Sequence, residues 1–260
     1  MLTAITRQAS SSINRCELTF HAKEPIDIAK AIAQHEAYEE CLRQLGARVI
    51  SLPAEPDLPD AVFVEDAAIV VDEVAVIPIM GASSRRPETE SLAQALSVYR
   101  PLNFMQPPAT LDGGDVMRIG RRLFVGASSR TNAVGIAQLR AFLAPFDYEV
   151  IAVDVKQCLH LKSGCSDIGR NSILVNGELI DLTRLTGFEL IDVPASEPGA
   201  ANALLIEDVL IVPNSFPQTI ALLEARGFSV KAIDVSEFQK AEGGVTCKSI
   251  IFNADAPDSA

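Results

Sequence analysis

The chain repeats one pattern four times: two short apolar strands joined by a tight turn, followed in most copies by a helix. The turns lie at Asp72-Glu73, near Gly120, at Asn176-Gly177 and at Glu207-Asp208. Asn-Gly is a strong hairpin signal. A single hairpin with its helix cannot bury its own apolar face, so such units pack against one another. The pattern therefore predicts an α/β fold of repeats around a common axis, with strand ends facing a central channel.

The strands and helices of these units can be placed from their apolar periodicity. Hairpins are expected at 63–71 with 74–77, 111–119 with 123–126, 172–175 with 178–180, and 203–206 with 209–212. Helices are expected at 25–45, about 88–100, about 132–143 and 217–227. The strand after Cys247 would belong to a fifth unit, completed by an N-terminal strand, and residues 13–20 are a further strand candidate. No linker or break in composition interrupts the chain, so a single domain over residues 1–260 is expected.

Composition narrows the class of protein. The chain has 260 residues, of which 48% are hydrophobic, so it can bury a substantial core. A net charge of −12 disfavours nucleic acid or an anionic membrane as partner. The first twelve residues lack the apolar run of a signal peptide, and no stretch approaches the roughly 18 apolar residues of a membrane span. Five cysteines without CxxC spacing predict no disulfide framework or zinc site, and favour a reducing cytoplasm.

One thiol has a setting suited to chemistry. Cys247 follows Gly243-Gly244 and precedes the apolar segment Ile250-Ile251-Phe252. The glycine pair lets the backbone approach a bound molecule closely, and the buried strand after it would hold the thiol on a rigid scaffold. A nearby base that lowers the thiol pKa would make Cys247 a nucleophile. The alternative is a structural cysteine, since free cysteines are among the most buried residues.

Polar residues at equivalent strand ends would share one pocket if the units converge on an axis. They are Glu65, Asp66, Asp112, Asp115, His160 and Cys247, with Arg85 and Arg130 in loops after the first two hairpins. His160 beside Cys247 would lower the thiol pKa or protonate a leaving group, and Asp112 could orient it. Taken singly, Asp112 and Asp115 could be turn residues, and the two arginines could be solvated surface charges. Glu65 and Asp66 inside an apolar strand are costly to bury unpaired.

Six motifs in order resemble the dimethylarginine dimethylaminohydrolases, which belong to a guanidino-group-modifying superfamily with the arginine deiminases and amidinotransferases. The motifs are Leu58-Pro59-Asp60 with Phe63-Val64-Glu65-Asp66, Gly81 with Ser84-Arg85-Arg86, Leu111-Asp112-Gly113-Gly114-Asp115, Ser129-Arg130-Thr131-Asn132, His160-Leu161-Lys162 and Gly243-Gly244-Val245-Thr246-Cys247. The resemblance extends from about residue 24 to 252. It implies a five-bladed α/β propeller, or pentein, of ββαβ-type repeats around a central substrate channel, which agrees with the repeat pattern.

The resemblance also implies a mechanism. Methylated arginine would be hydrolysed to citrulline and a methylamine through a covalent thiouronium on the nucleophile, without a metal or organic cofactor. The implied catalytic residues are Cys247 as nucleophile, His160 as general acid and then base, and Asp112 to orient it. The implied substrate-binding residues are Asp66 with Glu65 for the guanidinium, Arg85 and Arg130 for the α-carboxylate, and Asp60 for the α-amino group.

Lys162 bears on the choice of substrate. Arginine deiminases and amidinotransferases resemble each other in a His-x-Asp motif, whose aspartate clamps the guanidinium, and this chain has Lys162 at that position. The loss of that clamp leaves room for N-methyl groups and favours methylarginine. The segment Ile77–Met80 departs from the family pattern, and the N-terminal stretch to about residue 20, where the family has a substrate lid, is not matched.

Two other functions stay open. One is a related guanidino or ureido hydrolase, such as an arginine deiminase-like enzyme with a different substrate. The other is a non-catalytic propeller that binds a cationic amino acid. In each case the partner is a small guanidino amino acid, and the sequence leaves open whether two copies form a homodimer.

Overall fold

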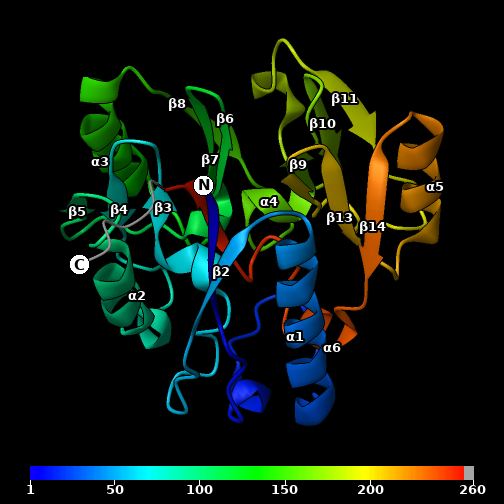
Figure 1. Ribbon diagram of the computed structural model, residues 1–260. Helices are drawn as coiled ribbons and strands as arrows, with labels where there is room; N and C mark the ends of the chain where they lie inside the picture. Colours follow the sequence, from blue (N-terminus) through cyan, green and yellow to red (C-terminus); the bar gives the residue numbers. More distant parts are fainter. Residues whose placement is uncertain (255–260) are drawn as a thin grey trace.

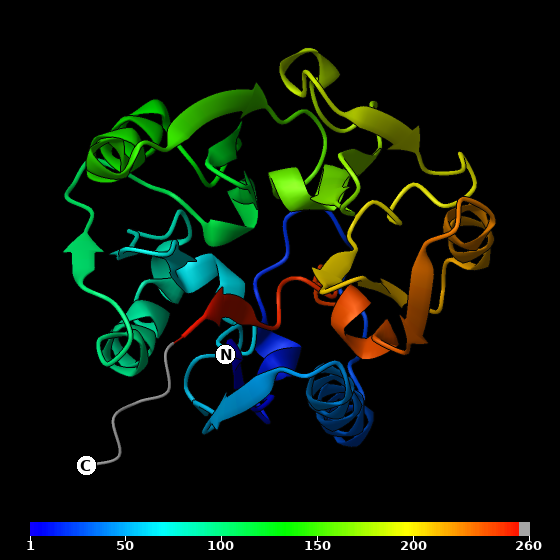
Figure 2. The same ribbon diagram turned by 45° about the horizontal axis from the view of Figure 1, so that its top comes forward.

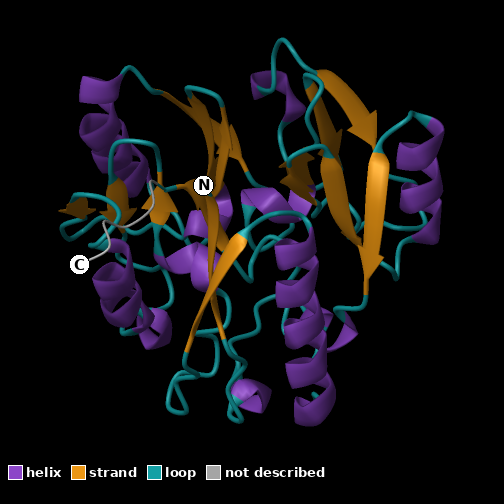
Figure 3. Ribbon diagram, in the orientation of Figure 1, coloured by secondary structure: helices purple, strands orange, loops and turns teal. Residues whose placement is uncertain are grey.

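A computed structural model of the protein, which describes residues 1–254, contains five separate three-stranded sheets (Figure 1). The sheets stand like blades around a shared centre, and their ladders do not join one blade to the next (Figure 2). The longer helices lie on the outer side of this ring, and short helices and loops lie nearer the middle (Figures 2 and 3). The α/β propeller predicted from the repeats is therefore confirmed, as five blades rather than a closed barrel.

Every blade has the same strand pattern: the first strand pairs antiparallel with the second, and the second pairs parallel with the third. In chain order four blades are β3 (Ile69–Val70), β4 (Ala75–Ile77) and β5 (Leu102–Phe104); β6 (Val116–Ile119), β7 (Arg122–Ala127) and β8 (Glu149–Asp154); β9 (Cys165–Asp167), β10 (Ser172–Val175) and β11 (Glu189–Asp192); and β12 (Leu204–Ile206), β13 (Val209–Pro213) and β14 (Ser229–Ile233). The fifth is β15 (Ile250–Asn253), β1 (Leu2–Arg7) and β2 (Arg48–Leu52).

Helices provide the crossovers that parallel pairing requires. They are α1 (Ile28–Gln44), α2 (Glu88–Leu96), α3 (Ala133–Leu143) and α5 (Pro217–Ala225), each between the second and third strands of its blade. In the β9–β11 blade a single 3-10 turn, Leu182–Arg184, takes that place. Two one-turn helices, α4 (Leu161–Gly164) and α6 (Ser236–Gln239), lie outside these crossovers.

The fifth blade joins the two ends of the described chain. Strand β1 pairs antiparallel with β15, with Ile5 opposite Ile250, and parallel with β2. This confirms that the strand after Cys247 is completed by an N-terminal strand. Because β15 begins three residues after Cys247, the fifth blade anchors the loop that presents the thiol.

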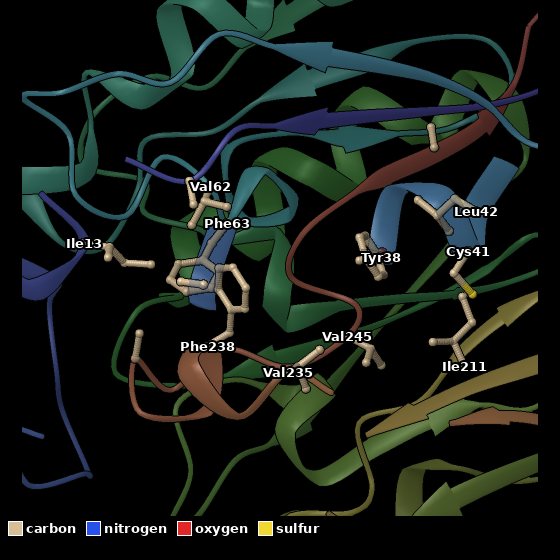
Figure 4. Packing of buried hydrophobic residues seen from close by; sticks show 14 of the residues in the cluster. Ile13, Tyr38, Cys41, Leu42, Val62, Phe63, Ile211, Val235, Phe238 and Val245 are labelled. Carbon is tan, nitrogen blue, oxygen red and sulfur yellow. The ribbon is translucent and has the colours of Figure 1, made fainter. Parts of the chain in front are cut away.

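A hydrophobic cluster lies between the fifth blade and the region of α6 (Figure 4). Helix α1 begins after Asp27, whose side chain accepts a hydrogen bond from the Lys30 amide at 3.0 Å. The helix contributes Tyr38 and Leu42 to the cluster, and Phe238 of α6 packs edge-on against Phe63 with ring centroids 6.2 Å apart. The loop with Cys247 rests against this cluster, so its backbone has a rigid support.

Four predicted strands differ from the structure. The strand expected at 111–119 begins only at Val116, because residues 113–115 form a 3-10 helix. Residues 64–67 form a 3-10 helix and the strand begins only at Ile69, so Glu65 and Asp66 do not lie in a strand. The Asn-Gly turn at 176–177 does not join a hairpin, because β10 pairs with β9 before it and Ile180 bridges to Val155 of the neighbouring blade. Near the N-terminus, residues 13–15 form a 3-10 helix, whereas the strand lies at 2–7. Within residues 1–254, no helix is long and apolar enough to cross a membrane.

Candidate active site

The Cys247 loop is held by close backbone contacts. A Cβ atom on Gly244 would lie 2.1 Å from Asn202 Oδ1, and one on Gly243 would lie 2.3 Å from the Phe63 ring. The same Asn202 oxygen accepts a hydrogen bond from the Val245 amide at 2.7 Å. The glycine pair is therefore needed for close packing, because a side chain at either position would push the thiol loop away from its support.

The Cys247 thiol faces a cavity lined by acidic and basic side chains. Its lining includes Asp60, Asp66, Arg85, Arg130, His160 and Cys247. Burial, together with the negative charges of Glu65 and Asp66, raises the pKa of the Cys247 thiol to about 12. The Gly244 amide, 3.3 Å from Cys247 Sγ, opposes that rise. A cation that enters the cavity would offset the carboxylates and favour the thiolate.

His160 lies between two carboxylates at the start of α4. Its Nε2 is 3.0 Å from Asp112 Oδ2, and its Nδ1 is 3.7 Å from Asp66 Oδ1. Burial alone would lower the pKa of His160, but the charge of Asp66 and the hydrogen bond with Asp112 outweigh it and raise the pKa to about 9. The imidazole is therefore protonated at neutral pH and can donate a proton to a leaving group.

Asp115 holds the backbone next to His160 in place. Its carboxylate accepts hydrogen bonds from Ser128 Oγ and Thr131 Oγ1, both at 2.6 Å, and from the Leu161 amide at 2.9 Å. Burial raises the pKa of Asp115 to about 6 despite these bonds. Asp115 thus fixes the backbone next to His160, a supporting role that the sequence did not indicate.

The two adjacent acids of the 3-10 helix have different partners. Glu65 accepts a hydrogen bond from Lys162 Nζ at 2.6 Å and one from Thr246 Oγ1 at 2.8 Å. Asp66 accepts from Arg85 Nη1 at 2.7 Å and from the Gly114 amide at 2.9 Å. Both carboxylates are thus compensated rather than left as bare buried charges.

The two arginines that the sequence placed together are not equivalent in the structure. Arg85 is buried and also contacts Glu88 at 2.9 Å, so its guanidinium is enclosed by two carboxylates. Arg130 donates from Nη2 to Thr19 Oγ1 at 3.0 Å, while its buried Nη1 has no hydrogen-bond partner among residues 1–254. Asp112 Oδ2 lies 4.0 Å from that Nη1, too far for a hydrogen bond, so of the two arginines Arg130 is the one that keeps an unused donor.

The segment 17–21 covers the cavity. Asp60 accepts hydrogen bonds from the Glu17 amide at 3.1 and 3.3 Å. Glu242, which has a left-handed φ of 58°, accepts from the amides of Thr19, Phe20 and His21. The cover is thus tied to the residue directly before Gly243, a link that could not be found without the fold.

A second cavity of about 310 Å³ meets the other side of Cys247. Its walls are largely apolar and include Leu159, Leu179, Pro198 and Phe216. Because Cys247 lines both cavities, a group bound at the thiol can extend from the charged cavity into the apolar one. Within the described chain all five cysteines are free thiols, and no cluster of three or more His, Cys, Asp or Glu side chains could hold a metal ion.

Fold and site together define a class: an α/β-propeller enzyme in which a thiol, an imidazole and the carboxylates of Asp60 and Asp66 line one small charged cavity. Comparison with known proteins narrows the class. The family described as "N,N dimethylarginine dimethylhydrolase, eukaryotic" matches residues 3–252. The chain belongs to the dimethylarginine dimethylaminohydrolase family, whose members are hydrolases that act on guanidino C–N bonds.

Two bacterial relatives and one solved structure illustrate the match. The N(G),N(G)-dimethylarginine dimethylaminohydrolase of Streptomyces coelicolor is 38% identical, over 95% of this chain and 95% of that protein. The Pseudomonas aeruginosa enzyme is 34% identical, over 89% and 92%. A cysteine-to-serine variant from P. aeruginosa, solved with citrulline, superposes with a TM-score of 0.92 at 32% identity, over 97% of this chain and 100% of that one. Arginine dihydrolase domains at 17% identity share only the fold.

Proposed function

We propose that the protein hydrolyses N,N-dimethylarginine and N-methylarginine to citrulline and a methylamine, with Cys247 as the nucleophile. The observation that supports this most is that Cys247, His160 and Asp66 line one cavity, with Asp112 buried behind His160 at 3.0 Å from its Nε2. The family relationship supports the same reaction, because a relative from P. aeruginosa was solved in complex with citrulline.

The charges at the two ends of the cavity suit a guanidino amino acid. Asp66 lines the cavity with the thiol and would bind the guanidinium nitrogens by charge-assisted hydrogen bonds. Glu65, which does not line this cavity and is held by Lys162 and Thr246, would add its negative charge from behind. The free Nη1 of Arg130 would bind the α-carboxylate, and Asp60 would accept from the α-amino group. Arg85, although it lines the cavity, would contribute mainly by fixing Asp66. Ionic contacts at both ends position the guanidinium carbon at Cys247.

The chemistry proceeds in two steps. When the cationic guanidinium binds, the Cys247 thiol releases its proton to solvent and the thiolate attacks the guanidinium carbon. The His160 imidazolium then gives its proton to the departing amine nitrogen as the C–N bond breaks. This leaves a thiouronium bonded to Cys247 and a neutral His160. His160 then takes a proton from water, and the resulting hydroxide attacks the same carbon. The C–S bond breaks, the new hydroxyl gives its proton to solvent as it becomes the ureido carbonyl, and citrulline and the thiolate are released. Asp112 stabilises His160 while it is charged.

Lys162 supports methylated arginine as the substrate. Its ammonium neutralises Glu65, where an aspartate would add a further negative charge for an unsubstituted guanidinium. The apolar cavity on the other side of Cys247 gives the N-methyl groups a place away from these charges. Both features disfavour arginine, which needs more hydrogen-bond acceptors and fewer apolar contacts.

The test is citrulline formation from N,N-dimethylarginine, N-methylarginine and arginine in parallel, with Cys247→Ser as control. We expect turnover of both methylated substrates, little turnover of arginine, and none by the variant. A preference for arginine would indicate a deiminase-like enzyme instead. If none of the three gives citrulline but methylarginine still binds in calorimetry, the protein is a binding propeller and the proposal is wrong.

A further inference from the structure

Lys248, the residue after the thiol, is buried in the hydrophobic core. Its exposed fraction is 0%, and its Nζ lies 4.1 Å from the centroid of the Tyr38 ring and 4.7 Å from that of Phe238. These two rings belong to the cluster against which Cys247 packs (Figure 4). Within residues 1–254 the Nζ has no hydrogen-bond partner. The chain thus places a lone amine on the core side of its reactive loop.

An amine in this position is costly unless it has a use. Burying an ammonium without a partner is strongly unfavourable, and two aromatic faces offset only part of the cost. Lys162 and Arg85 differ from Lys248, because each of them is paired with a carboxylate of the site. A methionine would fill the same space without desolvating a charge, so packing alone does not explain Lys248.

The groups around Lys248 leave it titratable near neutral pH. Helix α1 presents His35, Tyr38 and Cys41, the segment before α6 presents Asp234, and the loop itself presents Cys247. Burial lowers the pKa of Lys248 to about 7, against the opposing effects of Cys247, Cys41 and Asp234. Burial also lowers the pKa of His35, so this neighbour adds no fixed positive charge.

We propose that Lys248 is a positioning residue that acts through Cys247, and that its buried ammonium stabilises the thiolate from the core side of the loop. The inference rests on the proposed role of Cys247 as nucleophile. The charges of Glu65 and Asp66 disfavour a thiolate, and that of Lys162 opposes them. The Lys248 ammonium, among the core rings, adds a second cation that counteracts the two acids through a low-dielectric interior, where charges interact strongly. The effect acts through space and transfers no proton between the two side chains.

The proposal is tested by the rate at which iodoacetamide alkylates Cys247, measured from pH 6 to 10.5, with the modified peptide identified by mass spectrometry. Lys248→Met removes the charge at similar volume. We expect alkylation to be several-fold slower than in the wild type at pH 6 to 7, where Lys248 carries its charge, and the difference to shrink above pH 8, with a melting temperature that is unchanged or a few degrees higher. A folded Met variant with the wild-type profile would overturn the proposal.

Lys248→Arg is an independent test, because the proposal predicts faster alkylation of Cys247 in this variant rather than slower alkylation. Arginine keeps its charge where Lys248 begins to lose it, so alkylation at pH 8 to 9 should be several-fold faster than in the wild type. An Arg variant with an equal or slower rate would contradict the proposal, whether or not the Met variant folds. Two controls should leave the profile unchanged: Tyr38→Phe, which keeps the ring under the amine, and Lys156→Met at the surface.

Alkylation needs no turnover, so this experiment separates the two proposals. If the profiles move as expected while no methylarginine is hydrolysed, the effect of Lys248 on the thiol stands and the proposed substrate is wrong. If methylarginine is hydrolysed while the profiles of both variants coincide with the wild type, the proposed function stands and Lys248 is only a buried structural residue.

Discussion

At the scale of single residues, the site works by paired charges. Asp66 is held by Arg85, Glu65 by Lys162, and His160 by Asp112. The sequence motifs were enough to single out the acids, the histidine and the thiol. They could not show that Glu88 encloses Arg85, because Glu88 belongs to no motif and its contact with Arg85 depends on the start of α2. The residues that meet at the cavity were thus predictable from the motifs, and the side chains that hold them were not.

The raised pKa of His160 predicts how the stability of the protein changes with pH. Its pKa of about 9 lies above the ordinary value of 6.5, so the folded state binds this proton more tightly than the unfolded state. Its contribution to stability is therefore complete below about pH 6.5 and is lost as the pH rises through 9. We expect the His160 ring proton to titrate near pH 9 by NMR, and at lower pH in Asp66→Asn. Titration near 6.5 in both proteins would contradict the arrangement.

Lys162 should control the choice between substrates. Lys162→Asp replaces the partner of Glu65 with a second negative charge near the guanidinium. We expect the ratio of kcat/KM for N,N-dimethylarginine to that for arginine to fall by about tenfold, since one charge contact is worth about 1.4 kcal/mol or more. Steady-state kinetics with both substrates measures the ratio, and Lys156→Asp at the surface is the control. An unchanged ratio in a folded variant would show that Lys162 does not select the substrate.

At the scale of elements, the cover over the cavity and the thiol loop are one connected unit. Three consecutive amides of the cover donate to Glu242, and Asp60 holds the cover at Glu17. An N-terminal strand was considered for residues 13–20 because the segment contains apolar residues. In the structure residues 13–15 form a 3-10 turn with local hydrogen bonds, whereas the amides of Glu17, Thr19 and Phe20 donate to distant carboxylates, which no local pattern reveals.

Weakening the hydrogen bonds between Glu242 and the segment 17–21 should expose the cavity below it. Glu242→Gln keeps the shape of the side chain but removes the charge that strengthens its hydrogen bonds, at a cost of about 1–2 kcal/mol. We expect KM for methylarginine to rise several-fold with a smaller change in kcat, and proteolysis within 17–24 to become faster. Glu24→Gln, at an exposed position of the same segment, is the control. Equal proteolysis of all three proteins would show that Glu242 does not hold the cover.

Two errors at this scale have one physical cause. Residues 63–68 were predicted as a strand because most of them are apolar. Instead, the Glu65 amide donates a hydrogen bond to the Cys247 carbonyl at 3.1 Å, and residues 64–67 form a 3-10 helix. The Asn-Gly turn predicted a hairpin, but the chain after it pairs with the neighbouring blade, as in the bond from the Lys156 amide to the Leu179 carbonyl. In both places contacts between blades replace the local preference.

At the scale of the whole molecule, the two ends of the described chain pair with each other as β1 and β15 of the fifth blade. The repeat pattern predicted four units from their turns, and the strand after Cys247 together with an N-terminal strand predicted a fifth. It could not predict that the third strand of every blade runs parallel to the second, since that pairing is made across a helix. The pairing of β1 with β15 closes the arrangement around the site.

Ile5 tests this closure. It is fully buried between Ile250 and Ile50, so Ile5→Ala should lower the free energy of unfolding by about 2–5 kcal/mol. Ile32→Ala, on the outer face of α1 with 40% of the side chain exposed, should change it by about 0.5 kcal/mol or less. Urea denaturation measures both. A similar small loss in the two variants would mean that the fifth blade does not hold the ring closed.

The most direct test of the account is the mass of the protein during turnover. Acid-quenched samples with N-methylarginine and with N,N-dimethylarginine should each contain a covalent adduct on the Cys247 peptide, and the two adducts should have the same mass. They should be identical because the methylated amine leaves before the thiouronium forms, and Cys247→Ser should show neither. Adducts that differ by the extra methyl group, or turnover by the serine variant at the wild-type rate, would contradict the proposed mechanism.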